Sequence, residues 1–191
     1  MTAKSVRRAP RPAPPGVAAK DEIEAMIRVD HAGEYGAVRI YEGQLAVFAA
    51  DKSKAKTVAA IKHMAKQEEE HLKAFAALVN ERRVRPTALA PVWRIAGFAL
   101  GATSALMGEK TAMACTAAVE EVIDRHYAGQ IERLGASDPV LRRTVEKFRA
   151  EEIAHHDTAL AHGAREAPAY RLLGGAIKAG CRLAIALSTR V

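Results

Sequence analysis

Aromatic residues are scarce in this chain, at 5% of 191 residues, and β-branched residues form few runs. Strands are rich in these residue types, so their scarcity argues against a β-sheet protein. Alanine, the strongest helix former, is abundant. A chain of this length fits one domain that is stable without disulfides. We therefore expect closely packed helices.

Cysteine is nearly absent. Cys115 and Cys181 lie far apart along the chain, and each has apolar neighbours in a helical context. Small buried side chains are the simplest interpretation, ahead of a disulfide or a thiolate site. Nothing in the cysteine usage argues for an oxidising compartment.

The chain also lacks a convincing membrane span. The stretch Ile95–Gly108 is uncharged and rich in glycine and alanine, but it ends at Glu109 and Lys110. A span needs about 20 apolar residues, which is more than this stretch supplies. We expect a buried or interfacial helix here.

Residues 1–20 lack the apolar core of a secretory signal. They carry five basic residues, no acidic residue, and four prolines between positions 10 and 15, which prevent an amphipathic helix. We expect a disordered basic tail over 1–20 and a single domain over 21–191.

The net charge of +7 is concentrated at the two ends. Basic residues dominate 1–20 and also 165–191, while the middle of the chain is mildly acidic. Such ends suggest an anionic partner, either lipid or nucleic acid. Helix-turn-helix, zinc-finger and aromatic-interleaved basic motifs are all missing, so we expect a membrane surface and no nucleic acid.

The last predicted helix, over 168–189, has a basic face and an apolar face. The polar face carries the basic residues Arg171, Lys178 and Arg182 together with Thr189, and the apolar face carries Leu173, Ile177, Ala184 and Leu187. A cationic amphipathic helix is typical of membrane-surface binding, although a helix that packs on a bundle shows the same pattern. The apolar stretch at 95–108 favours membrane contact.

Two Glu-x-x-His motifs are the most informative feature that is present. Glu68 and His71 form one, and Glu152 and His155 form the other. Lone glutamates, Glu34 and Glu120, precede them by 34 and 32 residues. Residues three apart share a helix face, so each motif presents a carboxylate beside an imidazole. Two helices with one Glu and two with Glu-x-x-His are the ligand set of a carboxylate-bridged di-metal site in a four-helix bundle.

The surroundings of the two lone glutamates are duplicated as well. Each is followed by Tyr at +7, which gives Tyr41 and Tyr127, by Gly at +9 and by Gln at +10. Seven residues make two helical turns, so each tyrosine shares a face with its glutamate. The repeat predicts two helical hairpins related by a pseudo-twofold axis, with metals on that axis.

Four carboxylates and two imidazoles suit iron, since hard oxygen donors tolerate Fe(III) and neutral nitrogens retain Fe(II). Six ligands for two metals leave positions for dioxygen. Bundle topology assigns Glu34 and His71 to one iron and Glu120 and His155 to the other, and Glu68 and Glu152 then bridge.

For residues near the predicted ligands, the sequence leaves more than one role open. Gly33 and Gly36 flank Glu34 and could admit a flat substrate, or they could serve close helix packing. His31 suits a capping or supporting role. Four acidic residues beside the motifs are either solvated or orient the histidines: Glu69, Glu70, Glu121 and Glu151.

Helices are expected over 21–50 and over 54–83. A third helix is expected to begin after Pro91, and a fourth contains Glu120 and ends near residue 135. The last two helices are expected over 139–162 and 168–189. Asp138 and Pro139 are a good N-cap and first helical residue for the helix that carries Glu152.

The segment RVDHAGEYGA at 28–37 closely resembles the first-helix signature of the demethoxyubiquinone hydroxylase family of ubiquinone biosynthesis. Further segments that match are RVRPT at 83–87, GFALG at 97–101, AMACT at 112–116, EE at 151–152, HHD at 155–157 and AGCR at 179–182. The resemblance runs from about residue 25 to the end, with a slightly longer link near 51–56.

The resemblance implies an all-α, ferritin-like four-helix bundle with two additional apolar or amphipathic helices. It implies a di-iron monooxygenase that uses dioxygen to hydroxylate the ring of a polyprenyl 6-methoxy-3-methyl-1,4-benzoquinol. Tyr41 and Tyr127 then either line the quinone pocket or relay electrons, with core packing the simpler alternative. The enzyme would be peripheral, on the cytoplasmic face of the bacterial inner membrane, and the resemblance allows for a lipid-binding partner protein.

Two other functions remain open. A ferritin-like or rubrerythrin-like protein for iron or peroxide handling would use the same ligands, but without the 95–108 helix or the cationic terminal helix. A non-enzymatic lipid-binding protein with a vestigial site is a second alternative, which occupation of all six ligand positions argues against.

Overall fold

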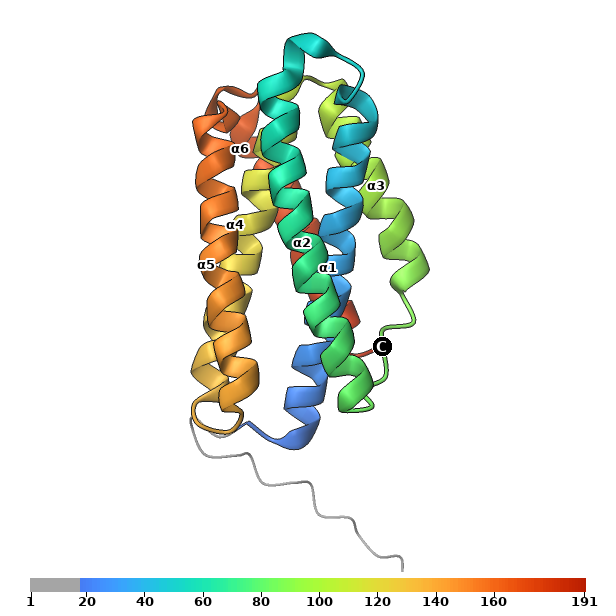
Figure 1. The fold of residues 1–191 in the computed structure, drawn as a ribbon, viewed down its shortest axis with the longest axis vertical. Coiled ribbons are helices and arrows are strands. Elements are labelled where there is room, and N and C mark those ends of the chain that lie inside the picture. The colour runs from blue at the N-terminus through green and yellow to red at the C-terminus, as the bar shows by residue number, and fades with distance from the viewer. Residues whose placement is uncertain (1–17) are drawn as a thin grey trace, which may run out of the picture.

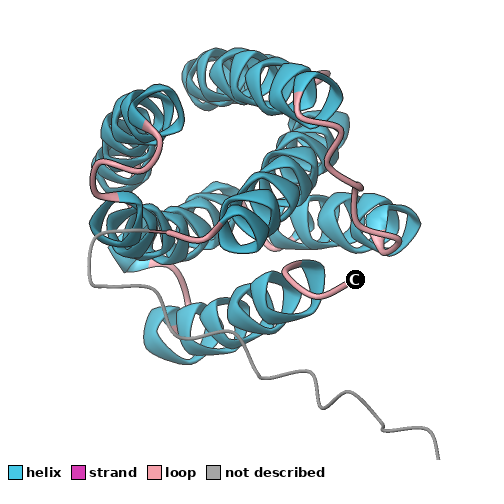
Figure 2. Ribbon diagram, turned by 90° about the horizontal axis from the view of Figure 1, so that it is seen from below, coloured by secondary structure: helices cyan, strands magenta, loops and turns pink. Residues whose placement is uncertain are grey.

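The computed structural model describes residues 18–191, and over that range the chain is helical, with loops and no strand (Figure 2). Six α-helices follow in order: α1 Lys20–Phe48, α2 Ala55–Glu81, α3 Ala90–Leu106, α4 Glu109–Leu134, α5 Pro139–Ala161 and α6 Tyr170–Ser188. Short 3₁₀ turns at Lys52–Lys54 and Ala164–Glu166 precede α2 and α6. The predicted all-α fold is confirmed, and each predicted helix is present within a few residues.

Helices α1, α2, α4 and α5 form the four-helix bundle (Figure 1). Helix α3 packs along α1 on the outside of the bundle, and α6 packs on α4 and contacts α1. These are the two additional helices that the sequence predicts. None of the helices in 18–191 combines the length and the apolar character needed to cross a bilayer.

Local signals in the sequence explain several helix boundaries. The Asp138 carboxylate accepts a hydrogen bond from the backbone N–H of Leu141 at 3.0 Å, and Pro139 is the first residue of α5, as predicted. Gly108, at φ +110°, lies between α3 and α4, where a residue with a side chain would be strained. Most of the predicted tail lies outside the described residues. Its end is ordered, because α1 begins at Lys20 and the N–H of Ala18 donates to Ser137 Oγ at 2.8 Å.

Glycine allows α3 to approach α1 closely. A Cβ atom on Gly101 would lie 1.9 Å from the carbonyl oxygen of Ile40, and one on Gly43 would lie 2.3 Å from the carbonyl oxygen of Phe98. Both contacts are far shorter than any real Cβ contact. The two glycines therefore determine how closely these helices pack.

Among the described residues, the apolar core contains three clusters, and two of them lie along the length of the bundle. One contains Met26, Phe75 and Phe148, near the start of α1, and the other contains Phe48, Ile61 and Met113, near its end. Burial of each such side chain stabilises the fold by roughly 1.5–3 kcal/mol. Glu34 lies between the two clusters along α1, so a polar centre in mid-bundle is enclosed by apolar packing on both sides.

Candidate metal centre

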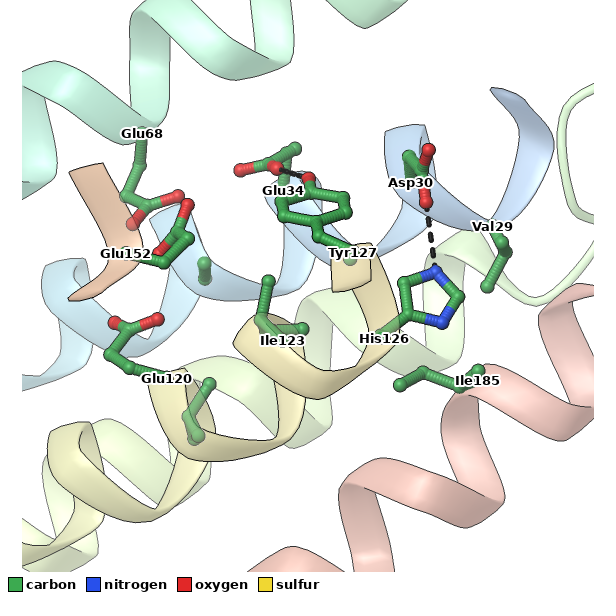
Figure 3. A pocket seen from close by; sticks show the side chains of 13 residues that line it. Val29, Asp30, Glu34, Glu68, Glu120, Ile123, His126, Tyr127, Glu152 and Ile185 are labelled. Carbon is green, nitrogen blue, oxygen red and sulfur yellow. Dashed lines mark hydrogen bonds and ion pairs between the residues drawn. The ribbon is translucent and has the colours of Figure 1, made fainter. Parts of the chain in front are cut away.

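The six predicted ligand residues converge in the middle of the bundle. Glu34 comes from α1, Glu120 from α4, and the two Glu-x-x-His motifs come from α2 and α5. All six side chains are at most 3% exposed. Figure 3 shows the carboxylates of Glu34, Glu68, Glu120 and Glu152 pointing toward one another from different helices. Six polar side chains buried at one point are a strong departure from ordinary core composition.

The six residues form two overlapping groups. Glu34, Glu68, His71 and Glu152 have ligand atoms within 4.8 Å of one another, and so do Glu68, Glu120, Glu152 and His155. Glu68 and Glu152 belong to both groups, as expected of bridging carboxylates. The two groups contain the residues that the sequence assigns to two metal positions, and that assignment stays a prediction.

Both histidines direct Nδ1 into the centre. His71 Nδ1 lies 3.1 Å from Glu152 Oε1 and 3.5 Å from Glu34 Oε2. His155 Nδ1 lies 3.1 Å from Glu68 Oε1 and 3.4 Å from Glu152 Oε2. Each imidazole thus presents one nitrogen to the carboxylates and keeps the other, Nε2, for contacts outside the centre.

Cations would satisfy atoms that the protein leaves without partners. Buried atoms that lack a hydrogen-bond partner include Glu68 Oε1, both carboxylate oxygens of Glu152, and Nδ1 of His71 and His155. Buried polar atoms are rarely left unpaired. Two divalent cations would also neutralise the four carboxylates, so the residues fit a di-metal centre.

Proton affinities in the centre reflect the burial of the carboxylates and imidazoles close to one another. Burial, together with the charges of Glu68 and Glu152, raises the pKa of Glu34 and of Glu120 well above the ordinary value. Burial also acts on Glu68, but the close imidazoles of His155 and His71 bring its pKa down to about 2. For His155 burial is outweighed by Glu152 and Glu68, which raise the imidazole pKa to about 9. Protons therefore compete with metals for this site.

A second layer of residues surrounds the centre, and the two tyrosines belong to it. The Tyr41 hydroxyl donates to Glu120 Oε1 at 2.7 Å, and the Tyr127 hydroxyl donates to Glu34 Oε1. Each tyrosine thus orients the carboxylate of the opposite hairpin. Tyr127 also lines the small cavity beside the carboxylates.

Several residues of this layer were not predicted from sequence. Gln67 contacts Nε2 of His155, and Asp30 accepts a hydrogen bond from Gln130 Nε2 at 2.7 Å. Asp30 also accepts a hydrogen bond from the His126 ring at 2.9 Å (Figure 3). The duplicated motif could have identified Gln67, because Gln67 and Glu151 each precede a motif glutamate by one residue. Glu151 contacts Nε2 of His71, which is one of the two roles expected for it.

An apolar cavity of about 620 Å³ adjoins the centre. Helices α1, α3, α4 and α6 line it, with Gly33, Leu100, Val119, Ile177 and Ile185 among its walls. Gly33, Val119 and Ile185 also line the small cavity that reaches Glu34 and Glu120. A Cβ atom on Gly33 would meet nothing within 4 Å, so this glycine leaves open space next to Glu34.

Gly36 likewise has open space for a Cβ atom, but its backbone makes a further contact. It also lines the apolar cavity, but its carbonyl oxygen would lie 2.8 Å from a Cβ atom on Gly97 of α3. Of the two roles considered for this glycine pair, Gly33 fits the open wall, and Gly36 also lies at the close contact between α1 and α3.

Comparison with known proteins gives the same family. Residues 21–188 match the model of the family described as Ubiquinone biosynthesis protein COQ7. The chain belongs to the COQ7 family. The family assignment confirms the resemblance found in the sequence, and it does not support the alternative of iron or peroxide handling.

Relatives with high identity are named as hydroxylases. The 3-demethoxyubiquinol 3-hydroxylase of Rhodospirillum rubrum is 55% identical over 169 residues, which cover 88% of this chain and 78% of that protein. The human mitochondrial NADPH-dependent 3-demethoxyubiquinone 3-hydroxylase is 51% identical over 173 residues, with the same two coverages. The mitochondrial 5-demethoxyubiquinone hydroxylase of Saccharomyces cerevisiae is 40% identical over 184 residues, again covering 88% of this chain and 78% of that protein.

Proposed function

We propose that this COQ7-family chain is a dioxygen-dependent di-iron monooxygenase of ubiquinone biosynthesis. Its substrate is the ring of a polyprenyl 6-methoxy-3-methyl-1,4-benzoquinol, to which it adds a hydroxyl group. One observation carries the proposal: the four glutamates of the buried centre line a small cavity that shares wall residues with a large apolar cavity. The buried centre suits oxygen chemistry at a metal, and the large cavity suits a lipid substrate.

The metal proposal follows the two overlapping groups. Glu34 and His71 would hold one iron, Glu120 and His155 the other, and Glu68 and Glu152 would bridge them. Oxygen-rich ligation with one imidazole per metal favours iron. Two iron ions held there would supply the activation of dioxygen, which the side chains cannot provide.

The chain's own contribution is to bind, orient and exclude water. The prenyl chain would occupy the apolar cavity, where burial of each CH₂ group stabilises binding by roughly 0.8 kcal/mol. The ring would lie against Gly33, which lines the small cavity together with Glu34 and where a Cβ atom would meet nothing within 4 Å. Val119 and Ile123 form the adjacent wall and keep that end of the cavity apolar.

We also propose that the protein works at a membrane surface, on the cytoplasmic face of the bacterial inner membrane. Large apolar side chains are exposed on the two outer helices, with Ile95 on α3 at 73% and Leu172 and Leu183 on α6 at 78% and 60%. Arg171 and Arg182 are exposed on the same segment of α6. Exposed apolar and basic groups together are typical of interfacial helices, and they are also compatible with a lipid-binding partner protein.

Purified protein reconstituted with Fe(II) tests the proposal. Supplied with dioxygen, a chemical reductant and a short-chain demethoxyubiquinol, it should yield the hydroxylated quinol, whose mass is one oxygen atom greater. With ¹⁸O₂ the added oxygen should carry the label. An iron-loaded protein that leaves the quinol unchanged in the presence of reductant would contradict the proposed activity.

A further inference from the structure

The two histidines of the centre meet chemically different groups at Nε2. The His71 ring contacts a carboxylate, with Nε2 2.5 Å from Glu151 Oε2. The His155 ring contacts a neutral amide, with Nε2 3.1 Å from Gln67 Oε1. Gln67 and Glu151 occupy equivalent positions, each one residue before a motif glutamate. The pseudo-twofold symmetry of the centre is therefore broken at this pair.

The difference changes how strongly each imidazole donates to a metal. A hydrogen bond from Nε2–H fixes the tautomer that leaves Nδ1 free, and both partners can accept that bond. A carboxylate acceptor also places negative charge next to the ring, which makes Nδ1 the stronger donor. An amide oxygen orients the ring without that charge.

The groups around Glu151 leave most of its negative charge available to the His71 ring. Its nearest cation is Lys147 Nζ, 3.7 Å from Glu151 Oε1, and the lysine side chain is mostly exposed. Phe148 stacks on His71 with ring centroids 3.9 Å apart, so that imidazole is held on its face as well as at its edge. The aromatic neighbours of His155 are more distant, with ring centroids 6.5 Å away for Tyr41 and 6.3 Å away for His71.

We propose that Glu151 and Gln67 are positioning residues that make the two metal positions unequal. The position of Glu34 and His71 binds its cation more tightly and fills first, and the position of Glu120 and His155 fills second. This inference rests on the proposed di-metal function. It adds an order of filling that the six ligands alone do not specify.

Anaerobic Co(II) titration of the purified full chain, followed by visible absorption and calorimetry, tests the order. The parent should bind two Co(II) in unequal steps. Glu151→Gln should weaken the first step by about 10–100-fold, the usual effect of removing such a partner, and bring the two steps together. Gln67→Glu should strengthen the second step, a gain that a folding defect cannot imitate.

Two variants that each lack one metal ligand show at which metal position Glu151→Gln weakens Co(II) binding. In Glu120→Gln, which leaves only the Glu34–His71 position with its full ligand set, adding Glu151→Gln should weaken Co(II) binding by about 10–100-fold. In Glu34→Gln the same addition should have little effect. An equal loss in both backgrounds, or none in either, would overturn the inference.

The parent titration separates this inference from the proposed function. Two Co(II) bound in equal steps would overturn the unequal positions and leave the di-metal function standing. A parent that cannot bind two metals would count against both.

Discussion

The two hairpins of the bundle, α1–α2 and α4–α5, share one set of side-chain contacts and differ in the residues that face the cavities. In both, the tyrosine at +7 donates to the glutamate of the other hairpin. In both, the glutamine at +10 donates to the residue four positions before that glutamate. Gln44 Nε2 contacts Thr116 Oγ1 at 3.3 Å, and Gln130 Nε2 contacts Asp30 Oδ1 at 2.7 Å. These shared contacts position the predicted ligand residues of both hairpins. The same contacts therefore occur twice.

The two hairpins differ in the residues that line the two cavities. Asp30 is joined by His126, and both line the small cavity beside the carboxylates. The counterpart of His126 in the other hairpin is Ile40, which lines the apolar cavity instead. A duplicated carboxylate and imidazole centre thus borders an apolar cavity that is not duplicated. We expect the duplicated residues to serve the proposed metals and the others to serve the proposed quinol site.

Loss of a bridging carboxylate should have the largest effect on the duplicated centre. Glu152→Ala should abolish binding of two irons and hydroxylation, because both metal groups include Glu152. Iron content by elemental analysis and helicity by circular dichroism check this result. Glu146→Ala, a half-exposed glutamate on the same helix, is the control and should retain iron and activity. Full turnover by the Glu152 variant would refute the assignment.

Filling the open wall should affect the quinol and spare the metals. Gly33→Leu places a side chain in space that is open next to Glu34, so hydroxylation should fall by at least about tenfold, as for a small misplacement of substrate. Iron content should stay at the parent level. Gly129→Leu is the matched control, since Gly129 is a helical glycine with equally open space and is absent from the walls of both cavities. Parental activity in the Gly33 variant would mean that the ring does not use this wall.

The two glutamine contacts should differ in their effect on stability. Asp30→Ala removes the acceptor that His126 and Gln130 share and leaves them only their contact with each other at 2.9 Å, so it should lower the free energy of unfolding by about 3 kcal/mol. Thr116→Ala should cost about 1 kcal/mol, because Gln44 keeps its bond to the Ala112 carbonyl. Urea unfolding of both variants measures the difference. Equal losses would show that the two halves are energetically alike at this position.

The smallest expected effect is on membrane binding. Arg171→Glu with Arg182→Glu should weaken binding to anionic vesicles by about 1 kcal/mol for each basic residue lost. Vesicle sedimentation at low salt measures it. Lys62→Glu with Lys66→Glu, two exposed positions on α2, makes the same change in net charge away from α6. If both pairs bind equally, α6 has only a structural role.

The sequence predicted the helices and the buried centre because both depend on short-range periodicity. Glu-x-x-His places its two side chains on one helix face whatever the tertiary fold. Contacts between helices depend on how each helix is rotated and packed, and these were not predictable. The pair of Glu151 with His71 crosses from α5 to α2, and Asp30 reaches His126 from α1 to α4.

The terminal helix illustrates the same limit. Its periodicity places Lys178 on a common basic face with Arg171 and Arg182. In the structure Lys178 Nζ donates to Glu121 Oε2 of α4 at 2.9 Å, while Leu172 and Leu183 are exposed. The periodicity identified an amphipathic helix, but the direction of each face was determined by α4. The apolar cavity is likewise a product of four helices and has no single sequence motif.

Quinone extracts of cells that lack this protein test the central claim most directly. The account predicts that a deletion strain loses ubiquinone and accumulates the demethoxylated precursor, detected by mass. The parent gene should restore ubiquinone, and the Glu152→Ala gene should not. An unchanged ubiquinone pool, in a strain with no second enzyme for this step, would contradict the assignment of this chain as the hydroxylase.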